Sequence, residues 1–326
     1  MLERTAGLPS IKALPRACVT AASLLLLLAP LHCAAAQADP QFGNDFRLRL
    51  PVDEVSLTFH AADAQGLPVN DLKAGEVTLL DNGRPPRRIL AFQLMQDFPI
   101  RAGILMDTSE SMTPHLQHAR AIAAKYAERL LRAQTDQAFV MDFGLLSNLR
   151  QPWTGDPAAL TAAIQRIMPG KENPLGGTRV FDTVFRACFN LFAKTGSAAS
   201  GNFVLLFSDG EDNASHVSLA EAVDQCQRSN TAIYAFRAET GSPSTGPKAL
   251  AELASQTGGR VFSDEDSDAA IDEDLRTIEA DLRNQYRLIY NPAQIRHDGS
   301  FHHIALLGPD RVSTIHVRSG YYAPSQ

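Results

Sequence analysis

The chain has 326 residues, of which 44% are hydrophobic and 20% charged, and its formal net charge is −6 at pH 7. This composition is typical of a globular protein and excludes a wholly disordered chain, and the length allows one large domain and a smaller one. The acidic balance argues against nucleic acid as a partner, because phosphate backbones require a basic surface.

The first 38 residues have the features of a secretion signal. Basic residues precede a leucine-rich apolar run at residues 21–28, and Ala36-Gln37-Ala38 fits a small-residue cleavage site. The run is shorter than the roughly 20 residues that a membrane span needs. Cys33 would be the modified residue of a lipoprotein, but the residues before it match that signal poorly. We therefore expect cleavage after Ala38, export to a periplasm or to the medium, and no membrane span in the mature chain.

The segment that follows, residues 39–97, has the pattern of β-strands. Apolar and polar residues alternate over residues 55–59 and again over 77–79, which is the period of half-buried strands. The sequence Asp-Asn-Gly at residues 81–83 is a hairpin signal ahead of another strand at 88–92. We expect an N-terminal β-strand module.

Residues 98–285 alternate short apolar runs with amphipathic helical patterns. The runs, which predict strands buried on both faces, lie at residues 102–106, 138–143, 203–207 and 232–236. The helical patterns lie at about residues 115–132, 158–167, 180–194, 218–229, 248–256 and 267–284. Strands without polar positions are typical of a parallel sheet that helices cover on both faces. The alternation therefore predicts an α/β domain with a doubly wound, mostly parallel sheet.

Strand patterns return after residue 285. They cover residues 286–290, 301–306 and 312–317. About four strands before the α/β domain and three after it are each marginal as an independent core, but together they suit a seven-stranded sandwich. We predict one β-sandwich made from residues 39–97 and 286–326, with the α/β domain inserted between them. The alternative is a separate N-terminal β-module with a C-terminal hairpin laid on the α/β domain.

After signal cleavage the chain would keep two cysteines, Cys188 and Cys226, each on the apolar face of a predicted helix. Two cysteines form neither a disulfide framework nor a zinc site. Free thiols packed as small hydrophobic groups and a single disulfide in an oxidising compartment are equally compatible with the sequence.

Side chains with oxygen donors lie directly after two of the apolar runs and in one loop. Asp-Thr-Ser-Glu-Ser follows the first run, Ser-Asp-Gly follows the third, and Gly-Gly-Thr precedes the helix at 180–194. Each segment alone would be explained by helix caps and turns. Ligands of such a sheet bind at the carboxyl ends of its strands, however, and hard divalent cations take oxygen ligands. The combination predicts a site for Mg²⁺, or alternatively Mn²⁺ or Ca²⁺, formed by Asp107, Ser109, Ser111, Thr178 and Asp209.

This order of residues resembles the von Willebrand factor A (VWA) domain, in which the corresponding five positions form the metal-ion-dependent adhesion site. The resemblance covers about residues 98–285. The flanking sequences GLPVNDLKAGEVTLLDNGRPPRRI, YRLIYNP and VRSGYYAP resemble exported bacterial VWFA-related proteins that are numerous in acidobacteria.

The resemblance implies a role for each candidate ligand. Ser109 and Ser111 would bind the cation through their hydroxyls, Thr178 would join them in a high-affinity arrangement, and Asp107 and Asp209 would act largely through waters. Neutral ligands leave much of the cation's charge uncompensated, so an open position would attract an Asp or Glu side chain of a partner protein. The expected function is cation-dependent protein binding without catalysis.

Two other functions are alternatives. Asp107 could be the nucleophile of a Mg²⁺-dependent phosphoryl-transfer enzyme, although Ser109 stands where haloacid-dehalogenase-like phosphatases have a second Asp, and Thr178 does not follow the Lys of a Walker loop. The chain could also be a structural envelope protein whose metal site is not used.

Three more acidic residues lie near the candidate ligands in sequence. Asp182, Glu211 and Asp212 either support the ligands through hydrogen bonds or are solvated charges. For Glu211 and Asp212 we expect solvated charges.

Overall fold

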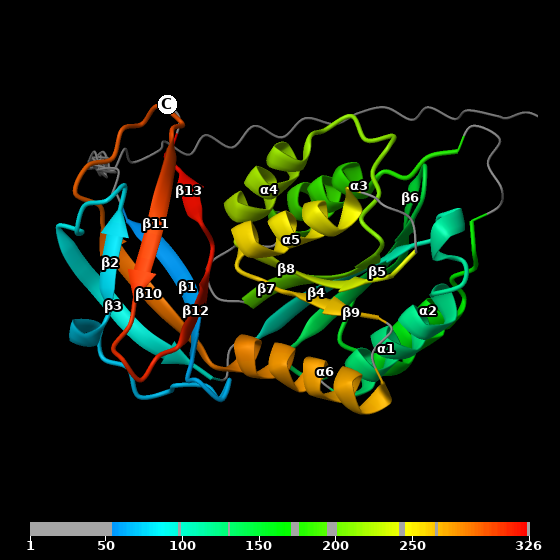
Figure 1. The fold of residues 1–326 in the computed structure, drawn as a ribbon, viewed down its shortest axis with the longest axis horizontal. Helices are drawn as coiled ribbons and strands as arrows, with labels where there is room; N and C mark the ends of the chain where they lie inside the picture. The colour runs from blue at the N-terminus through cyan, green and yellow to red at the C-terminus, as the bar shows by residue number, and fades with distance from the viewer. Residues whose placement is uncertain are drawn as a thin grey trace, which may run out of the picture. The chain divides into compact units, whose positions relative to one another are not determined.

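The structure is a computed structural model that describes residues 54–96, 99–129, 131–170, 176–193, 201–240, 245–264 and 267–324. The predicted signal segment and its cleavage site lie outside the described residues. The described residues belong to one compact unit, whose strands form three sheets (Figure 1).

The largest sheet has six strands in the order β6-β5-β4-β7-β8-β9. Five of its strands are parallel. Four of them contain the predicted apolar runs: β4 (Ile100–Asp107), β5 (Gln137–Phe143), β7 (Gly201–Ser208) and β8 (Thr231–Arg237). The fifth, β9 (Val261–Ser263), is short. The edge strand β6 (Ser147–Thr154) is antiparallel to β5. The sequence did not predict β6, because an edge strand with one solvated face carries many polar residues.

Helices cover both faces of this sheet, as Figure 1 shows. One face packs against α1 (Leu116–Arg129), α2 (Pro157–Gln165) and α6 (Asp268–Arg283). The other packs against α3 (Val180–Arg186), α4 (Leu219–Arg228) and α5 (Gly246–Thr257). Short helical turns lie at Ala74–Glu76 and Glu110–Met112. The predicted doubly wound α/β class is confirmed.

The remaining seven described strands form the two sheets of a sandwich. One sheet has the order β12-β1-β10-β3, from β12 (Thr314–Val317), β1 (Val55–Ala62), β10 (Gln285–Asn291) and β3 (Arg88–Met95). The other has the order β13-β11-β2, from β13 (Gly320–Tyr322), β11 (Phe301–Leu307) and β2 (Thr78–Asp81). Because β10 lies between β1 and β3, the two flanks share one sheet. The sandwich built from both flanks is confirmed and the separate-module alternative is wrong, while the exact domain boundaries stay predictions.

The Asp-Asn-Gly segment makes the expected tight turn but not the expected hairpin. Asn82 and Gly83 have φ of 48° and 73°, and Asp81 and Arg84 pair across the turn. Beyond that pair the strands separate, because β2 pairs with β11 and β3 pairs with β10 in the opposite sheet. The turn therefore carries the chain from one sheet of the sandwich to the other.

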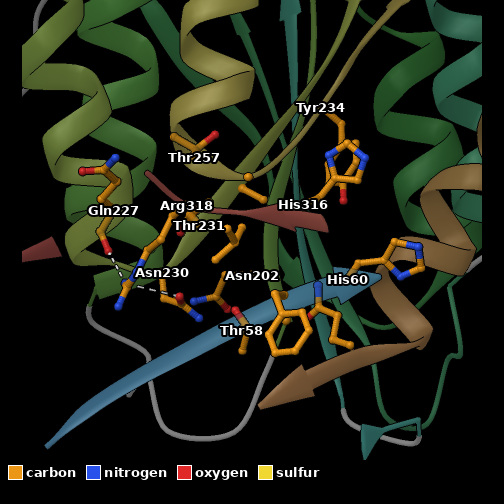
Figure 2. Close-up of a pocket in the computed structure, with 16 residues that line it drawn as sticks. Thr58, His60, Asn202, Gln227, Asn230, Thr231, Tyr234, Thr257, His316 and Arg318 are labelled. Atoms are coloured by element: carbon orange, nitrogen blue, oxygen red, sulfur yellow. Dashed lines mark hydrogen bonds between the residues drawn. The ribbon is translucent and has the colours of Figure 1, made fainter. Parts of the chain in front are cut away.

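A polar cavity of about 30 Å³ lies between the sandwich and the central sheet (Figure 2). Its lining includes His60 and His316 from the sandwich and Asn202 and Tyr234 from the central sheet. Arg318, which also lines it, donates hydrogen bonds to the Gln227 carbonyl at 3.1 Å and to Asn230 Oδ1 at 3.4 Å. The cavity has room for a water molecule but not for a larger ligand.

Cys188 and Cys226 form a disulfide with a Cα–Cα distance of 5.0 Å. The bond joins a π-helical segment, Ala187–Phe192, to α4. The structure thereby decides between the two alternatives that the sequence left open, and it also divides the single helix expected at residues 180–194 into α3 and this π-helical continuation.

Candidate functional site

Asp107 ends β4 at the carboxyl edge of the central sheet and is fully buried. Its Oδ2 accepts a 2.7 Å hydrogen bond from the Ser208 hydroxyl, and its Oδ1 accepts a 2.8 Å bond from the Ser109 amide. Burial raises the pKa of Asp107 to about 6, the nearby Asp209 adds to this rise, and the hydrogen bonds from Ser109 and Ser208 oppose it. The two hydrogen bonds hold both carboxylate oxygens of Asp107 in fixed positions.

The hydroxyls of Ser109 and Ser111 lie side by side, with 3.2 Å between their Oγ atoms. Ser109 precedes the helical turn at Glu110–Met112, but its side chain makes no capping hydrogen bond there. The long helix α1 begins only at Leu116. Helix capping therefore does not explain these hydroxyls.

Asp209 follows β7 and is 2% exposed. Its Oδ1 accepts a 3.1 Å hydrogen bond from the Glu211 amide. Its Oδ2 is buried and has no hydrogen-bond partner within the described chain. A buried oxygen without a partner typically costs about 1–3 kcal/mol, and more when it is charged. A cation beside this oxygen would remove the cost, so the residues present fit a metal.

Thr178 is buried and lies two residues before the start of α3. Its amide donates a 2.8 Å hydrogen bond to Asn213 Oδ1, and its carbonyl accepts from the amides of Asn213 and Ala214 at 3.2 Å. These bonds tie it to the segment that begins with Asp209. Among the described contacts, Thr178 has no side-chain hydrogen bond to the other four candidates. Hydrogen bonds thus link Asp107, Ser109 and Ser111, the residue before Asp209 bonds to Asp107, and Thr178 is joined to the Asp209 segment through a loop.

The end of β5 connects the first and second candidate segments. The amide and hydroxyl of Thr108 donate to the Phe143 carbonyl at 2.7 and 2.9 Å. The next carbonyl, that of Gly144, accepts a 3.0 Å bond from the Arg179 amide. Thr108 lies between two candidate ligands and Arg179 follows a third, so two consecutive carbonyls hold both segments beside one strand end.

Glu211 and Asp212 are not solvated charges, so the sequence-based expectation for them is wrong. Asp212 Oδ2 accepts a 2.8 Å hydrogen bond from the Phe181 amide in the first turn of α3. Glu211 Oε1 accepts a 2.9 Å bond from the Gly246 amide, where α5 begins. Both carboxylates thus neutralise helix N-termini and fix the loop after β7 against two helices.

Asp182 makes the reciprocal connection from α3 to the same loop. Its Oδ1 accepts from the amides of His216 at 2.8 Å and Val217 at 3.0 Å. Burial opposes its ionisation, but these amides and the His216 ring outweigh burial and lower the pKa of Asp182. The sequence could not identify these partners, since they lie more than 30 residues apart along the chain.

The von Willebrand factor type A domain family matches residues 103–211, a range that contains all five candidate ligands in order. The chain carries a von Willebrand factor type A domain. The resemblance predicted from the sequence is confirmed at this level.

Solved structures with a similar fold come from bacteria and from a mussel. A conserved hypothetical protein, BatB from Bacteroides thetaiotaomicron, is 17% identical, with a TM-score of 0.45 over 55% of this chain and 97% of its own. Proximal thread matrix protein 1 from the mussel byssus, solved with a zinc-occupied MIDAS motif, is 16% identical, with a TM-score of 0.48 over 63% and 50%. The von Willebrand factor domain of the type V pili tip protein Mfa5 from Porphyromonas gingivalis is 13% identical, with a TM-score of 0.45 over 56% and 95%. No curated protein matches the chain.

Three of the five candidate ligands in the VWA domain carry hydroxyl groups. Within the described ranges, no three His, Cys, Asp or Glu side chains cluster in a way that could hold a metal by themselves. The candidate site therefore depends on Ser109, Ser111 and Thr178 as much as on its two carboxylates. Such oxygen donors suit a hard divalent cation.

None of the described helices is long and apolar enough to cross a membrane.

Proposed function

We propose that the VWA domain binds a divalent cation, Mg²⁺ in the first place, and through it binds a protein partner that presents an Asp or Glu side chain. The observation that carries this proposal is the buried Asp209 Oδ2 without a hydrogen-bond donor. It lies in a site with the buried Asp107 and the adjacent hydroxyls of Ser109 and Ser111. A cation would satisfy an oxygen that the described chain leaves without a partner.

The proposed ligands divide into two groups. Ser109, Ser111 and Thr178 would hold the cation through hydroxyl oxygens, and Asp107 and Asp209 would hold it mainly through waters. A bound cation would supply a positive centre with an open position for an external carboxylate oxygen. Because hydroxyl ligands carry no charge, this centre would attract an anionic group strongly.

The geometry of Asp107 favours binding over phosphoryl transfer. A nucleophilic carboxylate must approach phosphorus with a free oxygen. Asp107 is 0% exposed, and Ser208 and Ser109 each occupy one of its oxygens. We therefore propose a binding module without enzymatic activity, and we do not assign the phosphoryl-transfer alternative.

We further propose that the protein is exported, to a periplasm or out of the cell. Two observations support this: the signal-like segment at residues 1–38 and the buried disulfide between Cys188 and Cys226. Disulfides persist mainly in oxidising compartments outside the cytosol. The acidic net charge also argues against nucleic acid as a partner.

Thermal-shift and calorimetric titration of residues 39–326 with MgCl₂, MnCl₂ and CaCl₂ tests the metal site. Binding to the folded state should raise the melting temperature, and a hundredfold excess over Kd should add about 2.7 kcal/mol of stability. Asp209→Asn and Thr178→Ala should abolish the shift while the variants stay folded. Thr113→Ala, an exposed hydroxyl two residues beyond Ser111, is the matched control and should keep it. A full shift in both site variants would place the metal elsewhere and contradict the proposal.

A further inference from the structure

Two exposed apolar side chains belong to segments that are hydrogen-bonded to Thr108, the residue between the candidate ligands Asp107 and Ser109. Leu146 is 71% exposed and Met168 is 66% exposed, the highest values among the large hydrophobic side chains of the described chain. Single exposed apolar residues are common on protein surfaces and need no explanation. These two are 22 positions apart in sequence, but Thr108 bonds both to the end of β5, three residues before Leu146, and to Gly170, two residues after Met168.

Leu146 belongs to the tight turn between β5 and β6. The Leu146 carbonyl accepts a 3.3 Å hydrogen bond from the Gly144 amide. The preceding residue, Phe143, provides the carbonyl that both the amide and the hydroxyl of Thr108 contact, at 2.7 and 2.9 Å. The Gly144 carbonyl in turn accepts from Arg179, the residue after Thr178. The turn is thus anchored to both sides of the site, while its leucine side chain faces solvent.

Met168 belongs to the loop that follows α2. Ile167 is buried and its carbonyl accepts a 3.0 Å hydrogen bond from Arg120 of α1. Two residues after Met168, the Gly170 amide donates a 2.8 Å bond to the Thr108 carbonyl. Hydrogen bonds therefore hold the loop at Ile167 and at Gly170, and Met168 lies exposed between these two residues.

We propose that Leu146 and Met168 form an apolar rim beside the metal site, and that the partner segment carries an acidic side chain flanked by apolar ones. This inference rests on the proposed function, because the carboxylate needs the cation as its counter-charge. The cation would fix the position of the acidic side chain, and its neighbours would cover the leucine and methionine. Burying large apolar side chains is the main source of affinity that a single carboxylate contact lacks. Met168, which is unbranched and adaptable, suits partners of more than one shape.

A displayed library of random 12-residue peptides provides the test. It is selected on immobilised residues 39–326 in 5 mM MgCl₂ and eluted with EDTA. The expected pool is rich in Asp or Glu with Leu, Ile, Phe or Met as near neighbours. The double variant Leu146→Gln/Met168→Gln should lower the affinity of a selected peptide by about tenfold or more, with the Mg²⁺ affinity of the protein unchanged. Leu67→Gln/Leu307→Gln, with starting exposures of 62% and 59% on the sandwich, should change neither affinity.

The outcomes separate the two proposals. An EDTA-eluted pool rich in acidic residues but without apolar neighbours would overturn the rim and leave the proposed function standing. Equal binding of the selected peptide by wild type and the Leu146→Gln/Met168→Gln variant would also overturn the rim. A pool without acidic enrichment, or one that EDTA does not release, would overturn the metal-mediated contact and the rim together.

Discussion

At Gly210 the segment that follows Asp209 approaches the start of α5 too closely for a side chain. Gly210 follows Asp209 and has φ of +80°, which L side chains rarely adopt. A Cβ atom there would collide with the Gly246 carbonyl oxygen and lie 2.6 Å from Leu250 Cγ. Glycine is therefore required at this position by backbone conformation and by space together, and it allows the Asp209 loop to pack against α5.

The two requirements can be separated by comparing Gly210→Ala with Gly66→Ala. Gly66 has the same φ of +80°, but nothing lies within 4 Å of its added Cβ. Gly66→Ala should cost about 1–2 kcal/mol of unfolding free energy from the backbone alone. Gly210→Ala should cost a further 1–3 kcal/mol, roughly, from overpacking. Urea unfolding of both variants measures the difference, and equal losses would show that the crowding at Gly210 relaxes without cost.

Single residues also show where prediction from sequence stops. Four of the five candidate ligands could be selected because they follow apolar runs directly, and Thr178 because it lies in a Gly-Gly-Thr loop before a helix, although their role as ligands stays a prediction. Asp212 offered no such signal, because its partner, the Phe181 amide, is 31 positions away. A carboxylate is recognisable as a helix cap only when the helix start is adjacent in sequence or when the fold is known.

Among the secondary-structure elements, α3 and α4 are joined covalently. The Cys188–Cys226 disulfide links the π-helical continuation of α3 to α4. The two cysteines are 38 positions apart in sequence, and both are fully buried against the central sheet. The bond restricts the unfolded chain by closing this loop. It therefore stabilises the helical layer that contains α3, the helix that begins two residues after Thr178.

Reduction of this disulfide should lower the free energy of unfolding by about 2–4 kcal/mol. The same wild-type protein, unfolded in urea with and without reductant, gives the comparison without a change in side-chain packing. Cys188→Ala/Cys226→Ala should show a similar loss and should not respond to reductant. An unchanged urea midpoint after thiol titration has confirmed full reduction would contradict the expectation.

The strands of the central sheet were the most predictable elements. β4, β5, β7 and β8 are buried on both faces, so their sequences are apolar almost throughout. β6 was missed because its burial pattern is mixed. The π-helical segment was missed because it continues the same apolar periodicity as α3, and the hydrogen-bond shift that defines it leaves no compositional mark.

At the scale of the whole molecule, histidines lie where the sandwich meets the α/β domain. His60 of β1 and His316 of β12 are cross-strand neighbours. The His60 ring contacts Asp281 of α6 at 3.2 Å, and Arg260 also pairs with Asp281. Burial lowers the pKa of His316 to about 4, and the positive charge of Arg260 and the neighbouring His60 add to this effect. The surroundings of His316 at this junction therefore favour its neutral form.

This arrangement predicts a loss of stability on acidification. The ordinary pKa of histidine is about 6.5, so between pH 6.5 and about 4 the unfolded chain binds a proton at His316 that the folded chain does not. The free energy of unfolding should therefore fall across this window, by about 2 kcal/mol from this residue after allowance for its partial exposure.

Urea unfolding at pH 7.0, 5.5 and 4.5 measures the effect. His316→Asn should flatten the decline relative to wild type, because the variant has no proton to gain at this position. His303→Asn replaces an exposed histidine of β11 and serves as the control. If His316→Asn and His303→Asn follow the same pH profile, the junction does not sense protonation of His316.

The sequence by itself determined the fold class and the candidate site. Apolar periodicity reports the burial of each segment, and oxygen donors at strand ends mark the carboxyl edge of the sheet. It also indicated that neither flank could form a core alone.

Only the tertiary structure decided how distant segments pair. It placed β10 between β1 and β3, sent the Asp-Asn-Gly turn across the sandwich, and joined Cys188 to Cys226. It also turned Glu211 and Asp212 from apparent surface charges into anchors of α5 and α3. The physical reason is the same in each case. Local sequence fixes how much of a segment must be buried, whereas its partner depends on contacts between residues that are remote along the chain and meet only once the core has formed.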